Sequence, residues 1–324
     1  MALDKVFAEL GLDSKDREIL FELDLDSRIS INKLAKKVKL NSGTVNYRIK
    51  KMEEKKVILG YYAVVDASLL GFEQFRIYLK YQYINPELEE NLLNYLAENE
   101  NIWWLGKTDG EFDLCFVIWV KNSFKFKEFW NKLMLKYRNL FQKINVSPYT
   151  GLFQFNLAFL NPENEKRVKI FSGTDKKISV SKKEEKILKL ISDNARTPSI
   201  EIAKKLKITP IQVKYALNKM KKLDLIQGFR LKLNFELLGL NYYKVNFNLK
   251  DLKQYNKLVN FALEHERIIY VDQTIGFSDF EAEIVCLSHK EFKGIMNEMK
   301  AKFSEIIKDY DYILYSEILK IKYF

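Results

Sequence analysis

The chain has 324 residues, of which 47% are hydrophobic and 30% are charged, and its formal net charge is +11. This length exceeds what one hydrophobic core normally organises, so we expect more than one domain, and the hydrophobic content excludes global disorder. The absence of a long apolar run and the acidic start of the chain favour a soluble, cytoplasmic protein without membrane contact.

The first part of the chain carries the pattern of three short helices. Residues 14–23 place apolar side chains at helical spacing, Ser30 can cap a second helix, and Asn41 or the serine after it can cap a third. Residues 38–41 form a short joint between the second helix and the third. Two short helices at this spacing, the second basic on its outer side, indicate a helix-turn-helix, to which residues 57–66 would add a small wing.

The following segment alternates strand and helix patterns. Residues 72–84 alternate apolar and polar side chains, as a half-buried strand does. The pattern then predicts a helix from Pro86 to about residue 99, two strands around Gly110, a helix over 123–139 and a strand over 152–160. The order βαββαβ indicates a ferredoxin-like α+β sandwich.

The second half of the chain repeats the first. Residues 12–71 and 180–239 align without gaps and share 17 identities. In the second copy we predict strands over 242–250, 267–275, 279–287 and 312–323, and helices over 251–265 and 289–304. The predicted fold class is α+β, in tandem: winged helix-turn-helix domains over 1–66 and 181–234, ferredoxin-like βαββαβ domains over 67–160 and 235–324, and a linker over 161–180.

The positive charge is concentrated on the two copies of the helix-turn-helix. Residues 28–60 contain ten Lys/Arg and two Glu, and residues 196–228 contain eight Lys/Arg and two acidic residues. These segments carry +8 and +6, so the rest of the chain is about −3. Such a distribution indicates a polyanionic partner, and double-stranded DNA fits better than an anionic membrane because neither segment has a broad aromatic face.

Several of these motifs resemble the leucine-responsive regulator/AsnC (Lrp/AsnC) family of transcription factors. In the first unit the resemblance lies in residues 12–20, 28–30, Leu34-Ala35, 43–45, Arg48, Met52, 57–66 and Leu70-Gly71. The second unit matches less closely, in Ile187-Leu188, 194–196, 202–209, Met220, 225–228 and Leu238-Gly239. The resemblance implies a winged helix-turn-helix followed by a ferredoxin-like domain that assembles dimers and senses amino acids. The resemblance therefore implies that the two ferredoxin-like domains pair within one chain, that the protein is a monomer or an even assembly of such pseudo-dimers, and that an amino acid is the candidate effector.

The third helix of each helix-turn-helix is the predicted recognition helix, with its N-terminal half against base edges in the major groove. In the first unit, the residues expected to face outward toward the bases are Thr44, Asn46, Tyr47 and Arg48, and the lysines expected to neutralise phosphates are Lys36, Lys37, Lys39, Lys50 and Lys51. The corresponding DNA-binding residues of the second unit are Lys214, Tyr215, Asn218 and Lys219. A solvated basic face is the alternative reading of both helices.

The two recognition helices differ at one position that matters for base reading. Arg48, which can donate two hydrogen bonds to a guanine, aligns with Ala216, and Gly43-Thr44 align with Ile211-Gln212. The first helix is thus expected to read bases, and the second to hold the duplex through phosphates. We expect an asymmetric DNA site.

A Gly-x-x-Asp turn occurs in both ferredoxin-like domains. By the family resemblance, this turn lies near an effector pocket, so the candidate effector-binding residues are Gly110, Asp113, Gly276 and Asp279. An ordinary β-turn, with glycine for backbone geometry and aspartate for local hydrogen bonds, is the competing explanation.

The sequence offers little for catalysis. His265 and His289 are the only histidines, and neither stands at metal-ligand or nucleophile spacing, while Cys115 and Cys286 lie in apolar strand patterns typical of buried thiols. We expect no metal, no cofactor and no enzymatic activity. Two alternatives remain: a siroheme decarboxylase-like enzyme, because such enzymes share this two-domain fold, and a sequence-indifferent architectural DNA-binding protein.

Overall fold

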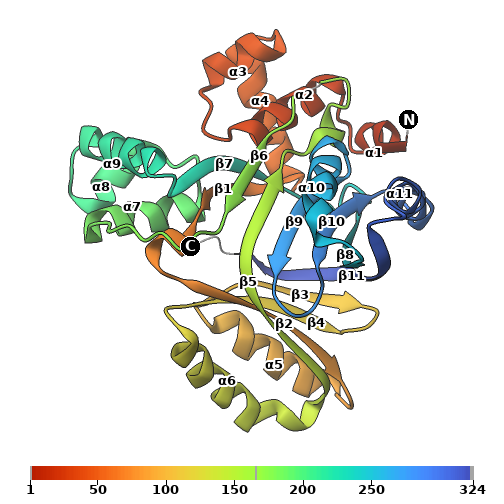
Figure 1. Cartoon of the computed structure of the whole chain (residues 1–324). Coiled ribbons are helices and arrows are strands. Elements are labelled where there is room, and N and C mark those ends of the chain that lie inside the picture. Colours follow the sequence, from red (N-terminus) through yellow and green to blue (C-terminus); the bar gives the residue numbers. More distant parts are fainter. Residues whose placement is uncertain (1, 165, 322–324) are drawn as a thin grey trace.

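The computed structural model describes residues 2–164 and 166–321, and it contains two helix-turn-helix domains above a closed system of strands (Figure 1). In the first domain, Asp13 caps the second helix through a capping box, and Ser30 and Asn41 cap the next two helices as predicted. The sequence reading missed the short helix that precedes them. The helices are α1 (Ala2–Glu9), α2 (Ser14–Leu25), α3 (Ile31–Val38) and α4 (Ser42–Glu54).

The second helix-turn-helix domain has the same three-helix core without a counterpart of α1. Ser181 and Thr209 each form a capping box at the start of a helix, and Pro210 occupies the first helical position of the third. The helices are α7 (Lys182–Asp193), α8 (Ser199–Leu206) and α9 (Pro210–Lys222).

The wing is shared between the two units. We predicted a small wing within each unit, but β1 (Ile58–Val65) pairs antiparallel with β7 (Ile226–Leu233) of the other unit. Tyr62 lies directly opposite Arg230, its own counterpart in the duplication. The pseudo-twofold axis of the molecule therefore passes through this strand pair, which joins the two helix-turn-helix domains.

Reciprocal contacts fix the helix-turn-helix domains to this shared sheet. The amide N–H of Ser27 donates to Phe229 O at 2.9 Å, and that of Ala195 donates to Tyr61 O at 2.9 Å. The Arg28 guanidinium binds the carbonyls of Ala195 and Thr197, while Arg196 donates to Ser27 O at 2.8 Å. The Arg28/Arg196 identity that the repeat preserves is thus explained by contact between the domains.

Below the wing, each unit adds the predicted βαββαβ unit. In the first unit the elements are β2 (Glu73–Tyr81), α5 (Pro86–Glu98), β3 (Ile102–Asp109), β4 (Leu114–Val120), α6 (Ser123–Tyr137) and β5 (Phe141–Phe155). In the second unit they are β8 (Asn241–Leu249), α10 (Tyr255–Glu264), β9 (Ile268–Thr274), β10 (Phe280–Cys286), α11 (His289–Lys302) and β11 (Ile307–Ile321). Short 3-10 turns occur at η1 (Ala67–Leu70), η2 (Arg138–Leu140), η3 (Ala158–Leu160) and η4 (Leu252–Gln254).

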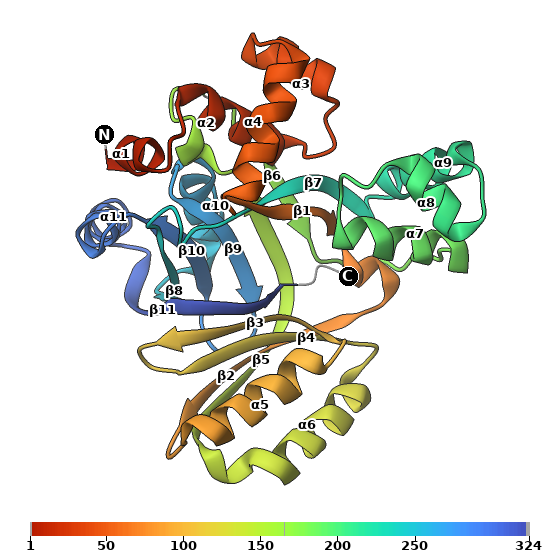
Figure 2. The same ribbon diagram turned by 180° about the vertical axis from the view of Figure 1, so that it is seen from behind.

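The two ferredoxin-like domains pair within one chain. Strand β3 pairs with β11, and β5 pairs with β9 in its second half and with β2 in its first half. The order β2-β4-β3-β11-β8-β10-β9-β5 therefore closes on itself, and we call this closed circuit of eight strands the barrel. Helices cover its outside, as both views show (Figures 1 and 2).

The terminal strands of both units are longer and begin earlier than predicted. We predicted 152–160 and 312–323, but β5 begins at Phe141 and β11 at Ile307 because each spans two partners in succession. Residues 158–160 form a 3-10 turn instead, and residues 322 and 323 lie outside the described part of the chain. A local pattern cannot reveal a partner strand that belongs to the other unit.

The predicted linker, 161–180, is not a free connection. Its residues Lys169–Ser172 form β6, which pairs with β5, and the N–H of Ile178 donates to Leu69 O. Gly173 has a positive φ of 135°, and a Cβ there would lie 2.3 Å from the backbone oxygen of Thr150. The segment is therefore docked along the first unit before it enters α7.

Candidate nucleic-acid interface and the cavity beneath it

The recognition helix of the first unit exposes most of the predicted DNA-contacting residues. The side chain of Tyr47 is 66% exposed, Asn46 and Lys50 are exposed, and Thr44 and Lys51 are half-buried at the surface of α4. Val45, Ile49 and Met52 fix the opposite side of α4 in the domain core. The predicted phosphate-contacting lysines Lys36, Lys37 and Lys39 lie at the exposed end of α3, although Lys37 also pairs with Glu22.

Arg48 does not extend outward from the recognition helix, contrary to the expectation. Its guanidinium binds Asp13 at 2.9 Å and Asp16 at 3.0 Å, and its side chain is 24% exposed. These carboxylates form the capping box of α2, so Arg48 ties α4 to the start of that helix. Reaching a base would require Arg48 to exchange both aspartates for the nucleic acid.

The recognition helix of the second unit is exposed but chemically different. Lys214, Asn218 and Lys219 are exposed, and Tyr215 is 72% exposed. Lys219 pairs with Glu184 at 2.8 Å, at the start of α7. Ala216, which aligns with Arg48, is buried, and this fits the inward direction of that position in both helices.

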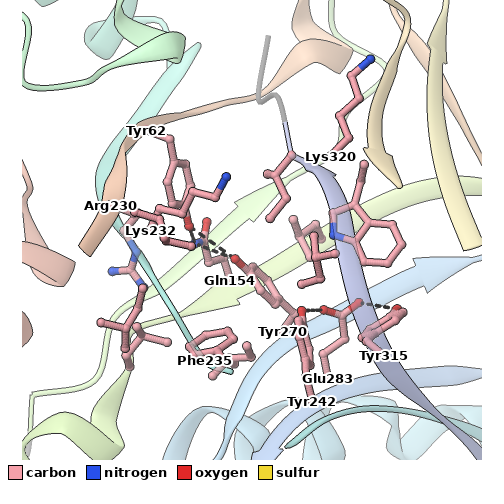
Figure 3. A pocket seen from close by; sticks show the side chains of 18 of the residues that line it. Tyr62, Gln154, Arg230, Lys232, Phe235, Tyr242, Tyr270, Glu283, Tyr315 and Lys320 are labelled. Atoms are coloured by element: carbon pink, nitrogen blue, oxygen red, sulfur yellow. Dashed lines mark hydrogen bonds between the residues drawn. The ribbon is translucent and has the colours of Figure 1, made fainter. Parts of the chain in front are cut away.

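A cavity of about 640 Å³ lies between the shared wing and the open end of the barrel (Figure 3). Side chains from β1 and β7 border it on one side, and side chains from β5, β8, β9, β10 and β11 border it on the other. Three tryptophans line it as well: Trp103, Trp104 and Trp119. No local sequence pattern indicates this cavity, because its walls come from both units.

Tyrosine hydroxyls and one glutamate make a polar lining in this cavity. Gln154 donates to the hydroxyl of Tyr62 at 2.6 Å and to that of Tyr270 at 3.3 Å. At the inner end, the hydroxyls of Tyr242 and Tyr315 both donate to the carboxyl of Glu283. Burial and the charge of Asp272 raise the pKa of Glu283 to about 7.

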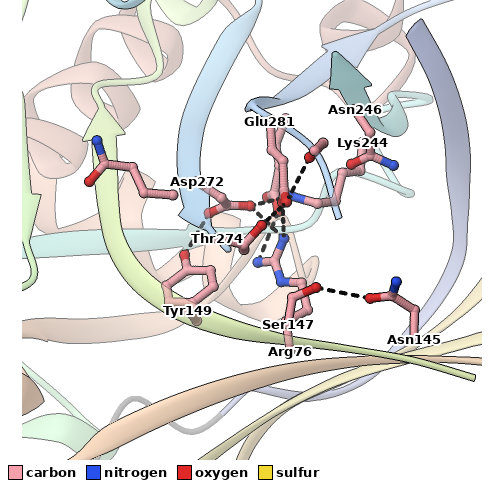
Figure 4. A network of polar contacts seen from close by, with 12 residues as sticks. Arg76, Asn145, Ser147, Tyr149, Lys244, Asn246, Asp272, Thr274 and Glu281 are labelled. Carbon is pink, nitrogen blue, oxygen red and sulfur yellow. Dashed lines mark hydrogen bonds and ion pairs between the residues drawn. The ribbon is translucent and has the colours of Figure 1, made fainter. Parts of the chain in front are cut away.

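The interior of the barrel holds a cluster of buried charges (Figure 4). Arg76 and Lys244 each pair with Asp272, Glu281 and Glu283, and all five side chains are at least nine-tenths buried. Although burial opposes ionisation, Arg76 and Lys244 hold the pKa of Asp272 well below its usual range. The polar face of β2, which the alternating pattern had shown, therefore faces this interior.

The cluster is asymmetric with respect to the duplication. Arg76 and Lys244 are counterparts, one from each unit, at equivalent positions in β2 and β8. The three carboxylates all come from the second unit. The positions of the first unit that correspond to Asp272, Glu281 and Glu283 are Gly106, Cys115 and Val117.

The two Gly-x-x-Asp turns hold strand ends together. Asp113 accepts the backbone N–H of Tyr81 at 2.7 Å and pairs with Lys80 at 2.7 Å. Asp279 accepts the backbone N–H of Leu249 at 2.8 Å. Gly110 and Gly276 have positive φ angles of 126° and 93°, as tight turns require. These four residues do not line the cavity, and effector binding at the turns stays a prediction.

Neither histidine nor cysteine forms a recognisable chemical centre in the described residues. Cys115 and Cys286 are buried free thiols, as predicted. His265 faces Glu298 at 3.8 Å, and burial lowers the pKa of His265. Within residues 2–164 and 166–321, no group of three or more His, Cys, Asp or Glu is arranged to hold a metal ion, and no helix is long and apolar enough to cross a membrane.

Comparisons with known proteins match both halves of this architecture. The model of the winged helix-turn-helix DNA-binding family matches residues 12–58 and 181–227. An HTH-type transcriptional regulator of Pyrococcus furiosus is 32% identical over 140 residues, which cover 42% of this chain and 90% of that protein. The regulator LrpB of Bacillus subtilis is 30% identical over 133 residues, which cover 40% of this chain and 85% of LrpB.

A solved structure with the same tandem arrangement is also known. The siroheme decarboxylase NirDL superposes with a TM-score of 0.64 over 96% of this chain and 94% of that chain, at 14% sequence identity. An identity this low shows a common fold and leaves the activity open.

The two exposed recognition helices and the winged helix-turn-helix matches define a DNA-binding transcriptional regulator. More closely, the chain belongs to the Lrp/AsnC family of transcriptional regulators, in which it is a tandem duplication of the helix-turn-helix and ferredoxin-like unit.

Proposed function

We propose that the protein binds one DNA duplex with both recognition helices and reads two unequal half-sites. The observation that carries this proposal is the difference between α4 and α9, which are held on one shared wing. A homodimer presents identical helices to identical half-sites, whereas this chain presents two different ones. The β1–β7 pair and the Arg28 and Arg196 contacts set their separation, and therefore the spacing of the half-sites.

In the first half-site, base reading is assigned to residues at the N-terminal half of α4. Asn46 and Tyr47 are exposed there, and Thr44 lies one turn earlier. Arg48 reaches a guanine only by leaving Asp13 and Asp16, so the loss of these ion pairs is subtracted from the energy of its base contact. Phosphate contacts come from the lysines at the end of α3 and along α4.

In the second half-site, α9 holds the duplex through Lys214, Asn218 and Lys219. The exposed Ile211 and Tyr215 offer apolar contact, for which thymine methyl groups are the fitting partners in the major groove. This half-site is therefore read less strictly than the first.

Selection of binding sites from random DNA, with each variant, tests this division of roles. Arg48→Ala is expected to cost about 1–3 kcal/mol on the preferred site and to relax discrimination at one base pair. Asn218→Ala is expected to cost less and to leave the selected motif unchanged. Because Arg48 also stabilises the domain, thermal unfolding of each variant serves as the control. A palindromic motif, or an equal loss of specificity from both substitutions, would contradict the proposal.

A sequence-indifferent architectural protein would behave differently in competition. Specific and random duplexes compete for the protein at one fixed salt concentration, because phosphate contacts alone depend on salt and carry no sequence preference. A regulator prefers the selected site by orders of magnitude. Equal competition by both duplexes would support the architectural reading.

A siroheme decarboxylase activity is not favoured by the residues of the cavity. Siroheme is a polycarboxylate, so its pocket needs unpaired cations. Here the lining contains the carboxylates of Asp24, Asp272, Glu236, Glu283 and Glu317. Of its cations, Arg76 and Arg230 are paired with carboxylates and Lys320 donates to backbone carbonyls, so a single ammonium group, that of Lys232, would face the several carboxylates of siroheme. No histidine occurs among the described residues that line the cavity. Addition of siroheme with a search for a shifted absorption band is the direct check.

A further inference from the structure

The cavity between the wing and the barrel is lined by the ammonium group of Lys232, which has no carboxylate partner among the described residues. Lys232 lies on β7 and is half-buried, and Figure 3 shows its side chain among those that surround the cavity. Among the described residues, none provides a carboxylate within ion-pair distance of Lys232 or a hydrogen bond to its ammonium group. Burial lowers the pKa of Lys232. A cation that loses hydration and gains no partner is costly, and an anion in the cavity would offset that cost.

A second cation on the same face of β7 has unused donors. Arg230 lies two residues before Lys232, and residues two apart in a strand point to one side. Its side chain is 1% exposed, and it binds the carbonyl of Phe155 and the carboxylate of Asp24 through Nη2. Its Nε and Nη1 have no hydrogen-bond partner among the described residues. These nitrogens are enclosed by the protein, so Arg230 adds positive charge beside the cavity, while Lys232 is the cation that a ligand can reach.

The register of the wing places a glycine opposite Lys232. Lys232 lies opposite Gly60, and a Cβ built on Gly60 would meet no atom within 4 Å. The counterpart of Lys232 in the first unit is Val64, which also lines the cavity. At this position of the wing the two units therefore supply one lysine rather than two.

The buried carboxylates at the cavity are already engaged. Asp24 accepts the N–H of Leu157 and pairs with Arg230, and Asp272 pairs with Arg76 and Lys244. Glu283 accepts hydrogen bonds from two tyrosine hydroxyls. Glu236 and Glu317 are exposed. An anion at Lys232 thus meets no unpaired buried carboxylate.

We propose that this cavity binds a small aromatic carboxylate, with its acidic group at Lys232 and its ring among the aromatic walls. The volume of about 640 Å³ lies in the range of small-molecule sites, which are mostly apolar with a few polar groups that fix orientation. The residues that provide aromatic walls include Tyr62, Trp104, Phe235 and Tyr270. This ligand site is independent of the DNA-binding proposal and differs from the Gly-x-x-Asp turns.

The three tryptophans that line the cavity allow a direct test with the full-length protein by intrinsic fluorescence. The probes are 3-phenylpropionate, phenylalanine and phenethylamine, which share a ring and differ in charge. The carboxylate-bearing probes are expected to change the fluorescence saturably, and phenethylamine is not. Binding of 3-phenylpropionate alone identifies a simple acid, and binding of phenylalanine identifies an amino acid; both outcomes support the site.

Substitutions of Lys232 establish which group holds the acid. Lys232→Met keeps the length of the side chain and is expected to weaken binding at least about tenfold, because a charged hydrogen bond is lost. Lys232→Arg keeps the charge and is expected to retain binding. Lys320→Met is the matched control, since Lys320 also lines the cavity but donates to the carbonyls of Ala97 and Asn99. Saturable binding of phenethylamine alone, no response to any probe, or unchanged binding by Lys232→Met would overturn the proposal.

Discussion

The chemistry of single residues is most unusual inside the barrel, where five charged side chains are buried together. With Asp272 and Glu281 ionised, their charges balance those of Arg76 and Lys244. Glu283 is then the one acid in excess, and its protonated form leaves the cluster neutral. Burial and the charge of Asp272 therefore raise the pKa of Glu283 to about 7, whereas Arg76 and Lys244 lower that of Asp272 despite its burial.

The stability of the protein should therefore depend on pH through Glu283. The folded state holds this proton more tightly than the unfolded chain, in which the pKa is near 4.5. The resulting stabilisation is complete below that value and is lost as the pH rises through about 7. Relative to Glu283→Gln, we expect the free energy of unfolding of the wild type to fall by up to about 3 kcal/mol between pH 4.5 and pH 8.

Chemical denaturation at a series of pH values measures this difference. Subtracting the stability of Glu283→Gln removes the pH dependence that comes from other groups. One of these is His265, whose lowered pKa makes the folded state more stable as the pH rises, opposite to the effect of Glu283. The low pKa of Asp272 stabilises the folded state at all pH values above 3.8, and this stabilisation changes with pH only below 3.8, outside this window. Parallel stability curves for the wild type and Glu283→Gln across the window would show that folding does not raise the pKa of Glu283.

At the scale of elements, the sequence predicts features that depend on local pattern but not those that depend on pairing between distant strands. The caps at Ser30 and Asn41 and the alternation of β2 predicted those elements, because each depends on neighbours along the chain. The shared wing, the strand β6 and the long β5 were missed, because each depends on a partner from a distant part of the chain. For the same reason, the cavity and the buried charges had no sequence signal, whereas the exposed recognition helices were found.

The reciprocal arginines predict equal effects from two distant substitutions. Arg28 and Arg196 each bind a carbonyl of the opposite helix-turn-helix domain, and each lies over an aromatic ring, Phe229 at 5.4 Å and Tyr61 at 5.2 Å. Arg28→Ala and Arg196→Ala should each destabilise the protein by about 1–3 kcal/mol and loosen the required spacing between half-sites. Binding to duplexes with one base pair inserted between the half-sites checks the second effect. An unaltered spacing requirement in both variants would mean that the β1–β7 pair alone sets the geometry.

At the scale of the whole molecule, the barrel explains why two diverged copies are joined in one chain. A barrel made of two first units would bury two copies of Arg76 with no carboxylate at the matching positions, Gly106, Cys115 and Val117. A barrel made of two second units would bury two lysines among six carboxylates. Only the mixed pair approaches neutrality, and a buried charge without a partner is strongly destabilising. The two units have therefore diverged into different partners whose buried charges complement each other.

This complementarity can be tested by dividing the chain between residues 176 and 177, which leaves β6 with the first unit. When the two fragments are mixed, we expect a complex with one copy of each, because only the mixed barrel pairs its buried charges. Native mass spectrometry distinguishes it from either homodimer. Arg76→Met in the first fragment should weaken the mixed complex, since three carboxylates would then face Lys244 alone. Homodimers that form as readily as the mixed complex would show that the buried charges do not decide the pairing.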